Sequence, residues 1–230
     1  MSEEECAGNY GRLSPQHRQR LESIADAFGT DADPAHDGLH VRRVARLAAQ
    51  IGAAEGANIA VVVPAALLHE LFSYPKNHPN SAQSGGKCAQ IAGDVLQAEG
   101  YPHTQTEAIC ECIRVHSYSR GINPRGRDPQ VLQDADRLDA IGAIGIARCF
   151  ATGTTMQRPF YAPDDPFCRA RTPDDSLWTL DHFYRKLLRL PQTLHTPTAR
   201  ALAQSRLAFL EQFLEQLTQE IGGGGRLDGQ

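Results

Sequence analysis

The sequence lacks the features that would place the chain in a membrane or in an oxidising compartment. Its longest apolar run, Ile59 to Leu68, is too short to cross a bilayer and contains Pro64. The first residues are polar and acidic, which is the opposite of a secretory signal. None of the six cysteines lies in a CxxC pair. We therefore expect free thiols in a cytoplasmic protein, with no disulfide framework and no membrane partner.

An excess of positive charge is also missing. The chain has 23 Lys and Arg against 27 Asp and Glu, which gives a formal net charge of -4. This balance does not attract a nucleic-acid polymer, so no such partner is expected. A small phosphorylated ligand needs only a local cationic site, and it stays open as a substrate. The sequence is compatible with a homo-oligomer but does not specify one.

Strand alternation is absent, and the dominant period of the apolar residues is helical. The chain has 230 residues, of which 41% are hydrophobic, so it can bury a sizeable core. We predict an all-α fold with one helical domain over residues 1–221 and a disordered glycine-rich tail over 222–230. Helices are expected from Ser14-Pro15 to Phe28 and over about 37–55, 59–71, 87–99, 104–116, 129–138, 140–151, 176–188 and 196–221, with an irregular lid or surface loop over 152–173.

Three apolar helices carry ionisable side chains at positions where burial would be costly. His40 lies on an apolar stripe, His69 and Glu70 end a nearly continuous apolar helix, and Asp136 precedes Arg137. Each feature alone is compatible with a structural role: a satisfied core histidine, a solvated helix end or an ion pair. Together they provide imidazole nitrogens and carboxylate oxygens, a ligand set that suits several divalent metals. Three protein ligands would leave positions open for water and phosphate.

The order of these segments and the residues in them resemble the HD-domain phosphohydrolase superfamily, in a bacterial branch of about this length. The resemblance covers roughly residues 33–220, and it implies an all-helical bundle around one divalent metal. It also implies hydrolysis of nucleoside triphosphates, often deoxynucleotides, to monophosphate and pyrophosphate. The matching phrases are His36-Asp37-x-x-His40-x-x-Arg43-Val44, Ala65-Ala66-Leu67-Leu68-His69, Gln133-Asp134-Ala135-Asp136-Arg137-Leu138, Ala140-Ile141-Gly142-Ala143-Ile144-Gly145-Ile146-Ala147-Arg148 and Asp181-His182-Phe183-Tyr184-x-Lys186-Leu187-Leu188.

The resemblance assigns metal ligation to His40, His69 and Asp136, and the fourth ligand position falls on Glu70. The family has an aspartate there, and glutamate is one methylene longer. Glu70 could therefore bind the metal at a different angle, lie behind the ligands, or mark an impaired site in a nucleotide-sensing relative. We expect one divalent ion, with manganese as the first choice and magnesium, iron, nickel, cobalt and zinc as alternatives.

Further side chains are expected to take part in catalysis around this centre. Asp136 could orient the attacking water as well as bind the metal, and Glu70 belongs to the same group. Lys76 follows in a short loop, where its ammonium could meet a phosphate or simply be solvated. His116 could be a general acid, a hydrogen-bond donor to a phosphate or a capping histidine. Asp37 could accept a hydrogen bond from a ligand histidine.

Substrate binding is expected from a set of cationic side chains that includes Lys76. Arg43 lies one turn from the first histidine and could clamp a phosphate or pair with Asp139. His182 and Lys186 are one turn apart, so they can face one site, although an ordinary surface pair has the same spacing. These residues are candidates for offsetting charge on phosphate oxygens.

The main functional hypothesis is a metal-dependent phosphohydrolase that acts on a small nucleotide. One alternative is a non-catalytic nucleotide-binding or regulatory module, for which the departure at Glu70 is the specific support. Another alternative is a di-iron oxygenase on the same fold, which would need a second-metal ligand such as His103.

Overall fold

The structure, a computed structural model, describes residues 15–28, 37–74, 78–117 and 121–222, and every regular element within them is helical. The expected all-α fold is thus confirmed for the described part of the chain. The elements are α2 (Pro15–Phe28), α3 (Gly38–Glu55), α4 (Ile59–Leu68), the 3-10 helix η2 (Ser81–Gln83), α5 (Ser84–Ala98), α6 (His103–Val115), α7 (Arg127–Asp139), α8 (Gly142–Thr155), α9 (Asp181–Arg185), the 3-10 helix η4 (Leu187–Thr193) and α10 (Pro197–Glu220).

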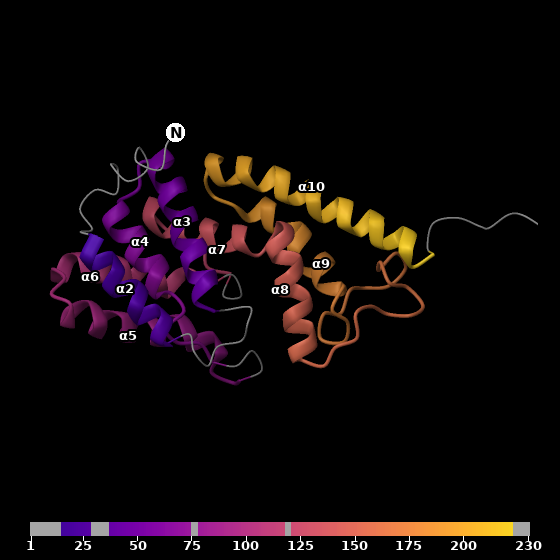
Figure 1. The fold of residues 1–230 in the computed structure, drawn as a ribbon, viewed down its shortest axis with the longest axis horizontal. Helices are drawn as coiled ribbons and strands as arrows, with labels where there is room; N and C mark the ends of the chain where they lie inside the picture. The colour runs from indigo at the N-terminus through magenta and orange to yellow at the C-terminus, as the bar shows by residue number, and fades with distance from the viewer. Residues whose placement is uncertain (1–14, 29–36, 75–77, 118–120, 223–230) are drawn as a thin grey trace, which may run out of the picture.

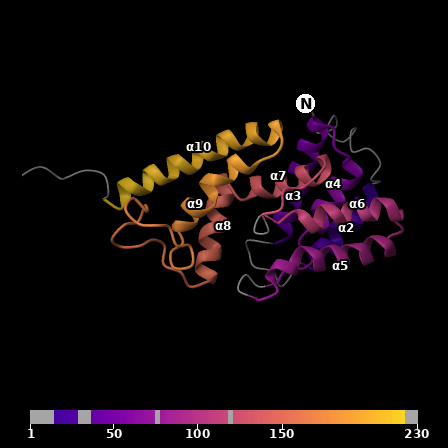
Figure 2. The ribbon, with the colours of Figure 1, turned by 180° about the vertical axis from the view of Figure 1, so that it is seen from behind.

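The helices divide into two halves that share α7 (Figure 1). Helices α2 to α6 cluster in the first half, whereas α8, α9 and α10 lie in the second. The view from behind shows the same division (Figure 2). Helix α10 packs along α8 and also contacts α7 and α3, so it ties the second half back to the first. We call residues 156–180, which join α8 to α9, the long segment.

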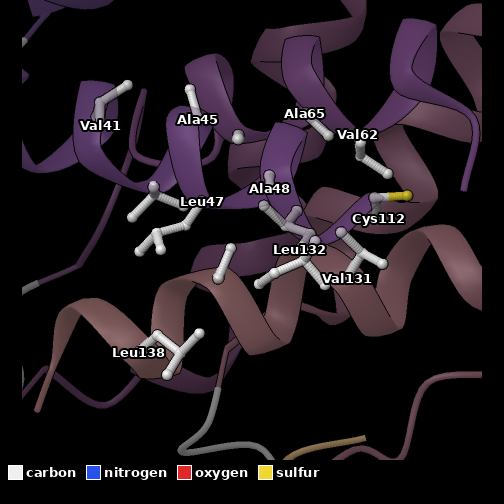
Figure 3. Packing of buried hydrophobic residues seen from close by; sticks show 14 of the residues in the cluster. Val41, Ala45, Leu47, Ala48, Val62, Ala65, Cys112, Val131, Leu132 and Leu138 are labelled. Atoms are coloured by element: carbon white, nitrogen blue, oxygen red, sulfur yellow. The ribbon is translucent and has the colours of Figure 1, made fainter. Parts of the chain in front are cut away.

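The first half is held together by apolar side chains between α3, α4, α6 and α7 (Figure 3). Helix α4 is apolar nearly all round, and it includes Pro64 within its length. Its surroundings bury eight of its ten residues, from Val61 to Leu68. The labelled core residues recur at helical spacing: Val41, Ala45, Leu47 and Ala48 on α3, Val62 and Ala65 on α4, Cys112 on α6, and Val131, Leu132 and Leu138 on α7.

Most of the expected helices occur within a few residues of their predicted ends, but one prediction is wrong. A continuous helix was expected over 176–188, and the chain forms only the short α9 followed by η4. The amides of Thr179 and Leu180 donate instead to the carbonyls of Pro159 and Phe160. Lys186 then leaves the helical region, with φ -134 and ψ -61. Tertiary hydrogen bonds have replaced the helical ones here.

Several sequence-based expectations concern residues outside the described part, namely Ser14, Cys6, Lys76 and the tail from 223 onward. Of the six cysteines, the five that are described are free thiols, as expected: Cys88, Cys110, Cys112, Cys149 and Cys168. Among the described residues, the search for a helix both long and apolar enough to cross a bilayer found none.

Candidate metal centre and adjoining pocket

Three predicted ligands come together between helices α3, α4 and α7. His40 lies near the start of α3, His69 caps the end of α4, and Asp136 lies in α7. The Nε2 atoms of the two histidines are 3.6 Å and 4.0 Å from Oδ1 of Asp136. Both imidazoles are buried, whereas 23% of the Asp136 side chain is exposed. These residues form a group that could hold one metal ion, which we call the candidate metal group.

Hydrogen bonds behind the imidazoles fix which nitrogen of each ring points to the centre. Nδ1 of His40 lies 2.7 Å from Oδ2 of Asp139, and Nδ1 of His69 lies 2.7 Å from the carbonyl oxygen of Ala66. A carbonyl or an ionised carboxylate can only accept, so each Nδ1 carries the hydrogen. The lone pair of each ring is therefore on Nε2, the atom that faces Asp136. Metal-binding histidines in proteins are oriented in this way.

The charge states of the group fit a divalent cation. Burial, together with the neighbouring His116 and His40, lowers the pKa of His69 to about 3, so the ring is neutral. Burial would raise the pKa of Asp136, but the surrounding imidazoles and Arg148 bring it below its ordinary value. Nε2 of His69 is buried with no hydrogen-bond partner among the described residues. A neutral imidazole and an ionised carboxylate are the states in which these side chains bind a metal.

Glu70 and His116 also lie close to His69. Oε1 of Glu70 is 4.0 Å from Nε2 of His69, and the His116 ring centroid is 5.1 Å from that of His69. These three residues form a second group that could hold a metal, whereas Glu70 is not part of the candidate metal group. His116 caps α6, and its Nδ1 donates to the carbonyl of Ile113 at 2.6 Å, as His69 does to Ala66. Its Nε2 is thereby left for other chemistry.

Asp139 connects the centre to two arginines. Its carboxylate accepts from Nε and Nη2 of Arg43, at 2.7 Å and 3.1 Å, and from Nη1 of Arg148 at 2.9 Å. Burial would raise the pKa of Asp139, but the hydrogen bonds from His40 and Arg43 lower it to about 2. Of the two roles expected for Arg43, the structure shows the pairing with Asp139.

Asp37 accepts a hydrogen bond from the ligand histidine His40, but from its backbone and not from its ring. Its carboxylate accepts the backbone N–H of His40 at 2.9 Å and caps α3, and it is Asp139 that bonds the imidazole. A backbone donor three residues along the chain lies within easy reach of an N-cap side chain. The sequence did contain an indication of Asp139, because it follows Asp136 by three residues and so shares its face of α7.

A pocket of about 80 Å³ adjoins Asp139 in the second half of the molecule. His182 and Lys186 both line it, so the structure brings them together as the sequence analysis expected. Arg148 and Arg158 line it as well, and neither was predicted as a site residue. No acidic side chain lines the pocket in the described part of the chain. The pocket is therefore cationic, and Arg148 joins it to the candidate metal group through Asp139.

Comparison with known proteins places the chain in a family. The HD domain family model matches residues 38–141. The uncharacterized protein YpgQ from Bacillus subtilis is 35% identical over 209 residues, which covers 89% of this chain and 94% of that protein. The crystal structure of B. subtilis YpgQ in complex with ADP has a TM-score of 0.70 at 31% identity, covering 90% of this chain and 98% of that one.

A second similar structure is that of a hydrolase. An HD-superfamily hydrolase from Bacillus thuringiensis has a TM-score of 0.68 at 30% identity, and the match covers 91% of this chain and 98% of that chain. The helical fold, the order of the motifs and the relatives matched over nearly their full length all indicate the same family. The chain belongs to the HD-domain phosphohydrolase superfamily.

Proposed function

We propose that the protein is a metal-dependent phosphohydrolase that acts on a small nucleotide, cleaving a nucleoside or deoxynucleoside triphosphate to monophosphate and pyrophosphate. The observation that carries this proposal is the link through Asp139 between the candidate metal group and a cationic pocket. A pocket of this size has room for a few water-sized groups, and so for part of a substrate such as a phosphate. The ADP bound to B. subtilis YpgQ supports a nucleotide.

His40, His69 and Asp136 would hold the metal, and Glu70 is the candidate for a further ligand. Manganese is our first choice, because imidazole and carboxylate ligands suit it and the resembling enzymes use similar ions. A divalent ion bound there would supply Lewis-acid polarisation of a phosphoryl oxygen and activation of water.

The remaining roles belong to side chains of this chain. Asp136 would orient the attacking water and accept one of its protons, as the water oxygen bonds to the α-phosphorus and the bridging P–O bond to the leaving pyrophosphate breaks. His116 would release a proton from Nε2 to the leaving pyrophosphate, since its Nδ1 is engaged with the carbonyl of Ile113. Arg158 and Lys186 would offset the negative charge on the phosphate oxygens. Lys76 lies outside the described residues, and its predicted role stays a prediction.

A non-catalytic nucleotide-binding module is the second candidate, because Glu70 groups with His69 and His116 rather than with the candidate metal group. The di-iron alternative needed His103 or an equivalent second-metal ligand. His103 does not lie at the centre, because 83% of its side chain is exposed and it pairs with Glu107 in the first turns of α6. An equivalent ligand would have to come from the group of His69, Glu70 and His116.

The deciding experiment is a turnover panel of nucleoside mono-, di- and triphosphates, with ribose and deoxyribose, on manganese-loaded protein of measured metal content. We expect triphosphates to yield pyrophosphate, and we expect a parallel Asp136→Asn preparation to show no turnover. Release of inorganic phosphate alone would contradict the bond that we propose. Stoichiometric metal with no turnover of any nucleotide would favour the binding module.

A further inference from the structure

The long segment forms one wall of the pocket although it contains no helix or strand. Two of its residues, Arg158 and Thr179, line the pocket from opposite ends of the segment. Two backbone hydrogen bonds, which we call the clasp, join these ends. The amide of Thr179 donates to the carbonyl of Pro159 at 3.0 Å, and the amide of Leu180 donates to the carbonyl of Phe160 at 2.8 Å.

The clasp also packs closely on α8. The amide of Arg158 donates to the carbonyl of Gly153 at 2.9 Å, and the hydroxyl of Thr179 donates to the carbonyl of Arg158 at 3.4 Å. A Cβ at Gly153 would lie 2.3 Å from Oγ1 of Thr179, so only glycine allows this approach. The backbone of Arg158 is therefore fixed on two sides.

Asp181 follows the clasp directly and anchors the middle of the long segment. It is fully buried, and its carboxylate accepts from Nη1 and Nη2 of Arg171, at 2.5 Å and 2.6 Å, and from the amide of Asp174 at 2.5 Å. Nε of Arg171 donates in turn to the carbonyl of Asp165 at 3.0 Å. One buried carboxylate thus connects α9 to Arg171 and Asp174 of the segment.

A second link runs from the same segment to the pocket. Oδ2 of Asp175 lies 2.8 Å from Nδ1 of His182, which lines the pocket. Asp175 directly follows Asp174, whose amide is held by Asp181. The ion pair between Arg171 and Asp181 is therefore connected to both Arg158 and His182. Neither Arg171 nor Asp181 lines the pocket itself.

We infer that the ion pair between Arg171 and the buried Asp181 is a positioning device, which holds the long segment so that Arg158 and His182 meet the phosphates of the substrate. The inference rests on the proposed function, because it assumes a phosphorylated ligand in the pocket. Removing Arg171 would leave the buried carboxylate of Asp181 without its compensating charge. The segment would then shift, and the pocket would lose its geometry while the candidate metal group, on other helices, keeps its own.

The test compares Arg171→Gln with Arg171→Lys and with the matched control Arg169→Gln, an exposed arginine of the same segment. For a nucleoside triphosphate, we expect Arg171→Gln to raise KM about tenfold with kcat and manganese content nearly unchanged, since small misplacements of binding groups weaken binding strongly. Arg171→Lys should recover part of the loss, because it keeps the charge. The control should match the parent protein.

Calorimetric titration with ADP on the manganese-loaded protein gives a readout that does not need turnover. Its Kd should rise about tenfold in Arg171→Gln, in parallel with KM. If the parent binds ADP but hydrolyses nothing, the proposed hydrolysis fails and the Kd values still decide the inference. An unchanged Kd in Arg171→Gln, or an equal rise in Arg169→Gln, would overturn it. If Arg171→Gln does not fold, Arg171→Lys decides by the same criteria.

Discussion

The two halves of the molecule position their functional groups by different means. In the first half, the candidate metal group lies on packed helices, and each imidazole is oriented by one buried hydrogen bond. In the second half, the pocket depends on the long segment, whose shape is set by polar contacts to Asp181 and to the clasp. The family model covers 38–141 and so ends where the pocket begins. Metal chemistry and substrate contact should therefore respond differently to mutation.

The largest effect should come from removing a ligand in the first half. We expect Asp136→Ala to lose both manganese binding, by more than about 100-fold, and hydrolysis, since even changes behind the ligands cost 10–100-fold. The fold should persist, because the helices on either side keep their packing. Metal analysis and circular dichroism check this, with Asp128→Ala on the same helix as the control. Parental turnover by Asp136→Ala would rule out its ligand role.

A gain is expected where the chain departs from its family. Glu70→Asp should retain metal binding and raise nucleoside triphosphate hydrolysis by up to about 100-fold, because a ligand misplaced by about 1 Å can cost that much. Glu70 is not part of the candidate metal group, although its Oε1 lies 4.0 Å from Nε2 of His69. Turnover at saturating manganese is the measurement, with Glu107→Asp as the control. A slower Glu70→Asp enzyme would mean that the backbone has adapted to glutamate.

Asp139 tests the connection between the halves. Asp139→Asn should weaken manganese binding about 10- to 100-fold, because the His40 ring loses its charged acceptor. It should also raise KM, since Arg148 loses the same partner. Competition for manganese with a fluorescent chelator measures the first effect, with Asp94→Asn, an exposed residue of α5, as the control. A change in KM alone would show that His40 does not need this carboxylate.

The smallest effect should be confined to the second half. Arg158→Gln should raise KM for a triphosphate about tenfold, as expected for the loss of one charge-assisted contact, and should leave manganese affinity unchanged. Steady-state kinetics at fixed manganese provide the measurement. Arg189→Gln, an exposed arginine of η4, is the control. A fall in manganese affinity would show that the two halves are not independent in the way that we describe.

The sequence was informative where function follows from local spacing. The helical period predicted α3 and α4, and the motif order predicted that His40, His69 and Asp136 would meet. It was uninformative where a contact joins distant residues. Asp139 is 99 positions from His40, and their hydrogen bond depends on how α3 packs against α7. The helix expected over 176–188 failed for the same reason, since the amides of Thr179 and Leu180 pair with residues about 20 positions earlier.

The shared carboxylate of Asp139 also has a thermodynamic consequence. Arg148 donates to the same oxygen, Oδ2, that accepts the hydrogen from His40. An anion that draws Arg148 toward the pocket would leave more negative charge on that oxygen, and so make His40 a more basic ligand. Any such effect is reciprocal: if the anion changes the affinity for the cation by some factor, the cation changes the affinity for the anion by the same factor. One hydrogen-bonded oxygen would thus couple the binding of the two ligands.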